Sequence, residues 1–314
     1  MTTLITGAGM LGVHLAKDLA DQGERVVLFE LNPVMWYINK VAGAERVEVI
    51  RGDVTNLGDL VAALQKSGAD CLVHTVGLLG AAVAAAPYTA VKVNTGGTVN
   101  AIEAARLTGV KRMVFASTMG VYDVTASGPM NEDQMTAPNS LYGATKLAAE
   151  RLALQYGAHY GVEVIALRYP VGYGYTFSAA GTPFGSVIYE VVAGPAEGRA
   201  VTVERSPLWM GYNEFVYAKD MARAAALAVR AEGLTDHIFN IGTGVLKDLA
   251  DIVASVKEEI PDAQITINEP NGPVQASSTR YPFDLVKAGE QLGYKPSYFI
   301  PEAVKDYIAS VRAS

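Results

Sequence analysis

In the first half of the chain, short hydrophobic runs alternate with longer helix-like segments. Such alternation is typical of βαβ units, in which helices join parallel strands. The hydrophobic runs are rich in β-branched residues and nearly continuous, which favours strands covered on both faces. The pattern predicts strands over residues 2–6, 25–30, 46–50, 70–75, 112–116 and 162–167, and helices over residues 10–21, 57–67, 87–107 and 140–160.

After residue 168 the chain becomes rich in Gly, Pro and Tyr, in the stretch YPVGYGYTFSAAGTPFG. This composition is typical of a loop that shapes a pocket. We therefore expect a doubly wound α/β fold with a smaller C-terminal lobe. Signals at residues 214–217, 220–230 and 237–241 are interpreted as chain returning to the sheet, and further helices are predicted near residues 247–259, 282–292 and 301–311.

The composition is that of a globular protein. Of the 314 residues, 50% are hydrophobic and 18% are charged, and the mean hydropathy is +0.19. These values exclude the charge-rich, apolar-poor composition of a disordered chain. The 25 Lys and Arg residues against 32 Asp and Glu residues give a net charge of −7, without a dense basic run. This balance argues against nucleic acid or a membrane surface as partner and favours a small molecule.

The single cysteine, Cys71, allows no internal disulfide, which favours a reducing, cytoplasmic compartment. The first residues lack the basic and apolar regions of a signal peptide, and the longest apolar-leaning stretch, residues 77–86, is too short to cross a bilayer. The four histidines are widely spaced, so we expect no metal site.

A glycine-rich motif, GAGMLG, directly follows the first predicted strand and opens the first predicted helix. Its glycines permit a tight turn, close approach of the backbone to a pyrophosphate, and close packing of the helix on the strand. The N-terminus of a helix also attracts an anion. The motif in this context predicts a dinucleotide site at Gly7, Gly9, Met10, Leu11 and Gly12.

Glu30, at the end of the second predicted strand, indicates which dinucleotide binds. A carboxylate accepts hydrogen bonds from a free ribose 2′-hydroxyl and repels a 2′-phosphate, so NAD is favoured over NADP. No Arg or Lys occurs between Leu31 and Asn39 to bind that phosphate. The alternative is a surface acid at a strand end. Asp53, in the turn after the third strand, is placed to accept from the adenine amino group, or is an ordinary turn aspartate.

Tyr142 and Lys146 lie four residues apart within a predicted helix, and therefore on one face of it. A nearby ammonium lowers the pKa of a phenol from its usual value of about 10, so that the phenol can exchange a proton near neutral pH. The alternative is a solvated pair on the helix surface, because this spacing is common by chance.

These motifs together resemble the extended short-chain dehydrogenase/reductases, also called the NAD-dependent epimerase/dehydratase family. The resemblance covers nearly the whole chain and depends on the order and spacing of several segments rather than on one motif. The segments are TGAGMLG, Asp53-Val54, HTVGLLG from His74, VNTGGT from Val93, VFASTMGVYD from Val114, Tyr142 with Lys146, LRYPVGYG from Leu167, NEFVYAKDMARA from Asn213 and D-x-x-K-A from Asp284.

The resemblance implies roles for individual residues. Tyr142 would be the general acid/base, Lys146 would lower the pKa of that phenol and hold the nicotinamide ribose, and Thr118 would hydrogen-bond the reacting oxygen, with the neighbouring Ser117 as the alternative hydroxyl. Positions that match the cofactor site of the family are Val54, Thr75, Val76, Gly77, Asn94 and Tyr169.

Three departures from the family pattern concern the substrate. Met119 and Gly120 stand where sugar-nucleotide dehydratases carry an Asp-Glu pair, which removes the acid and base needed for elimination. Asn213 and Val274 stand where members that bind nucleotide sugars usually place two diphosphate-binding arginines. Arg280 is the best substitute cation, and we expect it to bind substrate. A small sugar, sugar acid or hydroxy acid is therefore the expected substrate.

We thus predict a doubly wound parallel Rossmann sheet, formed by residues 1–170 plus about 214–245, that binds NAD. Residues from about 171 to 213, plus 246–314, would form the smaller α/β lobe for substrate. The expected reaction is hydride transfer at a secondary alcohol or ketone; the alternatives are a nucleotide-sugar epimerase and, less favoured, a non-catalytic dinucleotide-binding sensor. The helices around residues 87–107 and 140–160 are predicted to pair in a homodimer.

Overall fold

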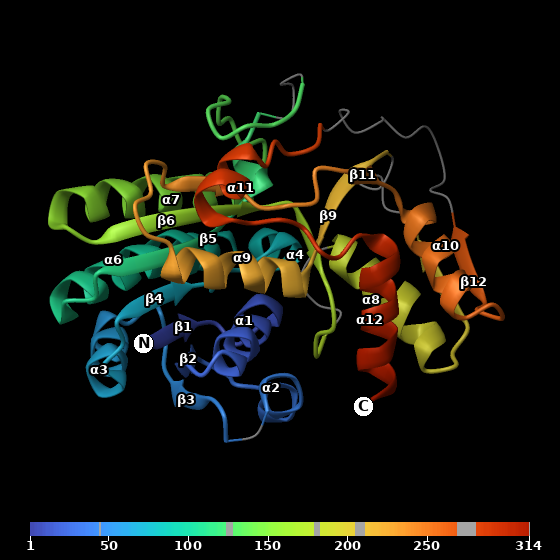
Figure 1. Cartoon of the computed structure of the whole chain (residues 1–314), viewed down its shortest axis with the longest axis horizontal. Helices are drawn as coiled ribbons and strands as arrows, with labels where there is room; N and C mark the ends of the chain where they lie inside the picture. The colour runs from blue at the N-terminus through green and yellow to red at the C-terminus, as the bar shows by residue number, and fades with distance from the viewer. Residues whose placement is uncertain (44, 124–127, 179–182, 205–210, 269–280, 314) are drawn as a thin grey trace.

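A seven-stranded parallel sheet forms the centre of the computed structural model (Figure 1), which describes residues 1–43, 45–123, 128–178, 183–204, 211–268 and 281–313. The strand order is β10-β6-β5-β4-β1-β2-β3, so the direction of winding reverses between β1 and β4. Ligands of such sheets bind at this reversal, beyond the carboxyl ends of the strands. The strands are β1 Thr2–Thr6, β2 Arg25–Glu30, β3 Glu48–Arg51, β4 Cys71–His74, β5 Arg112–Thr118, β6 Glu163–Tyr169 and β10 Ile238–Asn240.

Helices cover both faces of this sheet, as a doubly wound fold requires. On one face α1 (Met10–Asp21) packs between α2 (Met35–Ala42) and α9 (Ala218–Arg230), and Figure 1 shows α9 running beside α1. On the other face α6 (Gly97–Thr108) packs between α3 (Leu57–Ser67) and α7 (Leu141–Tyr160). The sheet therefore lies between two separate hydrophobic clusters.

A smaller group of elements stands beyond one end of the sheet, seen on the right of Figure 1. It contains a three-stranded sheet in the order β11-β9-β7 and a parallel pair formed by β8 and β12. Within the described residues these elements are β7 Val171–Tyr173, β8 Val201–Glu204, β9 Asn213–Tyr217, β11 Leu246–Lys247, β12 Ile265–Asn268, α8 Pro183–Ala196, α10 Leu249–Glu259 and α12 Ile300–Arg312. α11 (Val286–Leu292) lies apart from this group, against α9 and β10 of the main sheet.

The strongest sequence patterns gave correct boundaries: β1, β2, α1 and α3 begin and end at the predicted residues. Most other predicted elements are shifted at one or both ends, and α2 and α8 were not predicted. Two differences are larger. The helix predicted over residues 87–107 is divided into α5 (Pro87–Ala90), a π-helical segment η1 (Val91–Gly96) and α6. β9 pairs with β7 and β11 rather than returning to the main sheet. Pro170 lacks an N–H and separates β6 from β7, which continues into the small sheet.

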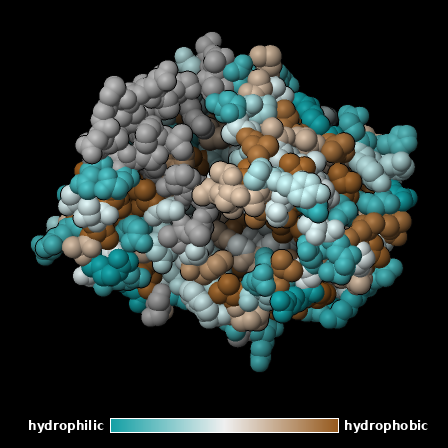
Figure 2. All heavy atoms as spheres, turned by 180° about the vertical axis from the view of Figure 1, so that it is seen from behind, coloured by the Kyte–Doolittle hydropathy of each residue, from teal (hydrophilic) through white to brown (hydrophobic). Residues whose placement is uncertain are grey.

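The surface mixes polar and apolar residues. Figure 2 shows hydrophilic and hydrophobic residues interspersed over the face opposite to that of Figure 1. No helix within the described residues is long and apolar enough to cross a membrane.

Candidate active site

A cleft of about 910 Å³ opens beyond the carboxyl ends of β1, β2, β4, β5 and β6. This is the place that the reversal of strand order predicts for a ligand. Most of the residues predicted from the sequence as cofactor, catalytic or substrate residues line this one cleft. They are Gly7, Gly9, Met10, Leu11, Gly12, Glu30, Asp53, Val54, Thr75, Val76, Gly77, Ser117, Thr118, Tyr142, Lys146 and Tyr169.

The glycine loop joins β1 to α1 with very little space between the two. Gly7 has a φ of +93°, a conformation that side chains disfavour. A Cβ atom at Gly12 would lie 1.9 Å from the carbonyl oxygen of Gly7. Gly9 caps α1 without a side chain, so the first N–H groups of the helix remain available at the cleft. The loop therefore offers the backbone donors and positive helix end that a pyrophosphate needs.

Glu30 is held in place at the end of β2. One carboxylate oxygen accepts from the backbone N–H of Ala8 at 2.9 Å and the other from that of Asn32 at 3.0 Å. The carboxylate thus ties the glycine loop to the turn after β2, and it faces the cleft where an adenosine ribose is expected.

Arg51 is a neighbour of Glu30 that the sequence analysis missed. It lies opposite Glu30 in the β2 and β3 register, and its guanidinium donates to the Leu31 carbonyl at 2.9 Å and to the Asn32 side chain at 3.4 Å. The relevant signal was the strand register, because the search for a cation covered only the residues that follow Glu30 in sequence.

Asp53 and Val54 line the cleft beside the end of β3. One oxygen of Asp53 accepts from the N–H of Thr55 at 2.8 Å, and the N–H of Asp53 donates to Asp59 at 3.0 Å. The turn is therefore rigid, and its carboxylate has accepting capacity for an adenine amino group. Val54 packs close to Gly97 at the start of α6.

Asn94 has a different position from the one expected. It is fully buried and does not line the cleft. Its side chain accepts from the N–H of Leu78 at 2.7 Å and donates to the Leu78 carbonyl at 3.1 Å and to Thr145 at 3.1 Å. Asn94 thus fixes the loop after β4, which presents Thr75, Val76 and Gly77, and ties that loop to α7.

Thr118, Tyr142 and Lys146 all line the cleft. Thr118 ends β5, and its hydroxyl lies near enough to the phenol of Tyr142 to favour the charged form of that phenol. Ser140 caps α7 by accepting from Gly143 at 3.1 Å, which places Tyr142 in the first turn of the helix. The ammonium of Lys146 lies 4.1 Å from the centre of the Phe115 ring.

The protonation of this group differs from the prediction. Burial raises the pKa of Tyr142 to about 12, partly offset by the hydrogen bond to Thr118. Burial also lowers the pKa of Lys146 to about 7, partly offset by Glu150. The expected lowering of the Tyr142 pKa by Lys146 is absent, because loss of solvent disfavours the charged form of both groups.

The three remaining predicted site residues are Ser117, Tyr169 and Arg280. Ser117 lines the cleft, but its hydroxyl donates to Glu150 at 2.6 Å. The ring of Tyr169 lines the cleft, but its hydroxyl donates to the Met221 carbonyl at 3.2 Å. Arg280 lies outside the described residues.

The cleft wall beyond Tyr142 includes Met119, Tyr122, Asp123, Met130 and Tyr281, which the sequence analysis did not assign. These residues come from segments far apart in the chain, which an isolated β-bridge between Met130 and Phe283 brings together. Among the described lining residues, Lys146 is the one Lys or Arg, against three carboxylates. No cluster of three metal-binding side chains occurs in the described part of the chain.

Several known proteins are similar to this chain in sequence and in fold. The model of the NAD dependent epimerase/dehydratase family matches residues 3–242. A UDP-glucose 4-epimerase from Lacticaseibacillus casei is 28% identical over 94% of this chain and 91% of its own. A UDP-glucuronate 4-epimerase from Thermodesulfobacterium geofontis is 25% identical over 96% of this chain and 93% of its own. The solved UDP-glucose 4-epimerase of Thermus thermophilus, in complex with NAD, is 26% identical, with a TM-score of 0.84 and 100% of both chains covered.

The family match covers more than half of the chain, and the relatives align along nearly their whole length. The resemblance seen in the sequence motifs is therefore confirmed, as are the doubly wound fold and NAD as the cofactor. This chain belongs to the NAD-dependent epimerase/dehydratase family, the extended short-chain dehydrogenase/reductases, and is an NAD-dependent enzyme.

Proposed function

We propose that Tyr142, Thr118 and Lys146 carry out hydride transfer between NAD and a secondary alcohol or ketone. The observation that supports this most directly is that all three residues line one cleft, with Thr118 at the end of β5 and Lys146 one turn along α7 from Tyr142. A reacting hydroxyl placed between the first two groups is held by one and exchanges its proton with the other.

Each residue has a defined task in this reaction. Thr118 holds the substrate oxygen, and Tyr142 removes its proton during oxidation and returns it during reduction. Lys146 holds the nicotinamide ribose, while Glu30 and the glycine loop hold the adenosine ribose and the pyrophosphate. When bound, NAD supplies the hydride acceptor and a positively charged ring that lowers the pKa of the phenol.

We propose a small sugar, sugar acid or hydroxy acid as the substrate. Asn213 stands at one of the two positions where a diphosphate-binding arginine is expected; it is buried, and its amide donates to the Gly211 carbonyl at 3.5 Å. Within the described lining, Lys146 is the one Lys or Arg, and the proposed reaction already uses it. A cleft with no further cation in its described lining suits a small hydroxyl-rich substrate better than a diphosphate.

The second candidate is a nucleotide-sugar epimerase, which oxidises and re-reduces one carbon without net turnover of NAD. The names of the two relatives and of the solved structure favour it, since all three are UDP-sugar 4-epimerases. Both candidates use the same catalytic residues. They differ in whether the oxidised intermediate leaves the cleft.

Two readouts distinguish the candidates. The purified enzyme is mixed with NAD and a panel of sugars, sugar acids, hydroxy acids and nucleotide sugars, and NADH absorbance and product stereochemistry are followed together. We expect NADH to accumulate with a small hydroxylated substrate. Inversion of a nucleotide sugar without NADH would favour the epimerase, and failure of the whole panel in both readouts and in thermal shift would contradict both candidates.

We propose that the protein is a homodimer joined through α5, η1, α6 and α7. Large apolar side chains are exposed on these helices: Tyr88 by 73%, Leu107 and Tyr160 by 50%, and Leu152 by 47%. Burying them against a second copy would be favourable. Sedimentation at micromolar concentration is expected to give the mass of a dimer, and a monomer would contradict the proposal.

We also propose that the chain divides into two lobes, a NAD-binding lobe of residues 1–170 plus about 214–245 and a substrate lobe of the remainder. Because β9 pairs with β7 in the small sheet, we assign residues 213–217 to the boundary between the two lobes. A cytoplasmic location is proposed on the basis of the single cysteine, Cys71, which is buried and free.

A further inference from the structure

A fully buried ion pair lies directly behind the reacting end of the cleft. The guanidinium of Arg168 on β6 donates to the carboxylate of Glu150 on α7 at 2.6 and 3.1 Å, and neither side chain is exposed to solvent. The same carboxylate accepts from the hydroxyl of Ser117 on β5 at 2.6 Å. Glu150 thus joins α7 to two strands of the sheet, and its charge is fully hydrogen-bonded.

The position of Glu150 on α7 relates it to the proposed catalytic residues. Tyr142, Lys146 and Glu150 follow one another at intervals of four residues, which places them along one face of the helix. Ser117, bonded to Glu150, directly precedes Thr118 on β5. The carboxylate therefore lies one turn behind the lysine and beside the strand that carries the threonine.

Few other titratable groups face Lys146. Tyr142 is on the same helix, and burial holds the pKa of its phenol high, so it is neutral at pH 7. His74 on β4 is also neutral, because burial lowers its pKa to about 3, and its Nδ1 is hydrogen-bonded to Thr6 at 2.7 Å. On β5 the lysine meets the uncharged ring of Phe115. Glu150 is the group that favours the charged form of Lys146.

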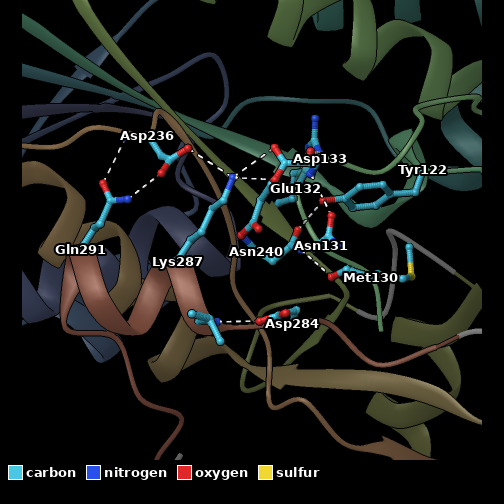
Figure 3. Close-up of polar contacts among 12 residues, drawn as sticks. Tyr122, Met130, Asn131, Glu132, Asp133, Asp236, Asn240, Asp284, Lys287 and Gln291 are labelled. Atoms are coloured by element: carbon cyan, nitrogen blue, oxygen red, sulfur yellow. Dashed lines mark hydrogen bonds and ion pairs between the residues drawn. The ribbon is translucent and has the colours of Figure 1, made fainter. Parts of the chain in front are cut away.

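Arg168 extends this arrangement toward the substrate end of the cleft. Its guanidinium lies 4.6 Å from the centre of the Tyr122 ring and donates to the carbonyl of Glu132 at 3.3 Å. The Tyr122 hydroxyl donates to the side-chain oxygen of Asn240 at 2.7 Å, and the Asn240 amide donates to the Met130 carbonyl at 2.8 Å. Figure 3 shows these residues side by side. Tyr122 and Met130 line the cleft, so the ion pair also contacts the part of the cleft wall that these two residues form.

We propose that Glu150 is a positioning residue for hydride transfer: its buried negative charge, one turn along α7, favours the ammonium form of Lys146, and its hydrogen bond with Ser117 holds the Thr118 end of β5 against α7. This proposal rests on the roles proposed above for Lys146 and Thr118. Burial works against a charged lysine here, and the charge of Glu150 partly offsets that effect.

The test is a titration of Lys146 in wild type and in Glu150→Gln. The substitution keeps the size of the side chain and removes its charge, so the pKa of Lys146 is expected to fall by about one unit. The lysine Cε resonances of the NAD-free protein are followed by NMR against pH, and that of Lys146 is assigned with Lys146→Met. In the loaded enzyme the alkaline limb of kcat is expected to move to lower pH by the same amount, because the ammonium is lost earlier as pH rises, with KM for the substrate less affected.

Four control variants separate charge from structure. Glu150→Asp retains the charge and is expected to restore the titration of Lys146. Ser117→Ala removes one hydrogen bond and leaves the ion pair, so the titration of Lys146 is expected to stay as in wild type. If Glu150→Gln does not fold, Glu150→Gln combined with Arg168→Gln, which leaves no lone buried charge, is compared with Arg168→Gln alone, so that the difference between their Lys146 titrations is due to Glu150.

An unchanged titration of Lys146 in Glu150→Gln, or equal titrations in the double variant and in Arg168→Gln, would overturn the proposal. A fall in the pKa of Lys146 in Glu150→Asp as large as that expected for Glu150→Gln would overturn it as well, because the effect would then not follow the charge. Because the NMR titration needs neither NAD nor substrate, its result does not depend on whether Tyr142 and Lys146 carry out the proposed reaction.

Discussion

Tyr142→Phe is expected to lower kcat by about three orders of magnitude, the middle of the range for loss of a general acid/base. Tyr142 lines the cleft together with Thr118 and Lys146, and Phe retains the ring while removing the exchangeable proton. NAD binding is expected to change by less than a few-fold, because Lys146, Glu30 and the glycine loop remain. Turnover is followed by NADH absorbance and NAD affinity by calorimetry.

Tyr122→Phe is the matched control for this prediction. Tyr122 also lines the cleft, and its hydroxyl donates a hydrogen bond to Asn240 at 2.7 Å. Losing that bond is expected to lower stability by about 1 kcal/mol and to change kcat far less than the loss of the acid/base. If Tyr142→Phe keeps more than a tenth of the wild-type kcat, Tyr142 is not the general acid/base.

Most of the fold followed from local pattern, because the strongest signals were local. The run Thr2–Thr6, the glycine loop and α1 form a continuous strand, turn and helix whose hydrophobic spacing, glycine positions and charge agree with one another. Such agreement gave correct boundaries. Where local and tertiary effects compete, as in η1, the pattern was misleading: a π-helical turn places Asn94 against the loop after β4, and no helix periodicity predicts that contact.

The candidate site was predictable where a motif fixes the backbone and less so where partners come from distant segments. Glu30 and Tyr142 line the cleft because Glu30 ends β2 and Tyr142 lies in the first turn of α7. The partner of Ser117 was not predictable, since a serine near a strand end gives no sign that a glutamate 33 residues later will accept from its hydroxyl. Tyr122, Met130 and Tyr281 meet only through the tertiary fold, so their place in the cleft wall is a structural finding.

The charges of the site were predicted least well from the sequence, because burial also depends on the tertiary fold. Spacing placed an ammonium near Tyr142, but it gave no measure of how much solvent both groups lose. In the folded chain burial decides the direction for each: the pKa of the phenol rises and that of Lys146 falls. A counter-charge one turn further along α7 was visible in the sequence as Glu150, whereas its partner Arg168 comes from a different element.

Gly12→Ala is expected to destabilise the protein by about 2–3 kcal/mol, as overpacking in a rigid backbone contact does. The added Cβ would lie 1.9 Å from the carbonyl oxygen of Gly7, so α1 must move away from β1. The loop that receives the pyrophosphate is then lost as well. A lower melting temperature of the NAD-free protein and weaker NAD binding in calorimetry would be measured together.

Gly9→Ala separates the two effects. A Cβ at Gly9 has no atom within 4 Å, and its φ of −78° suits alanine, so the NAD-free protein is expected to melt close to wild type. Because Gly9 faces the cleft, the added methyl group occupies space needed by the pyrophosphate, and NAD binding is expected to weaken at nearly full stability. Equal melting temperatures for the two variants would show that α1 and β1 tolerate a side chain at Gly12, and the close contact would then not be what fixes the loop.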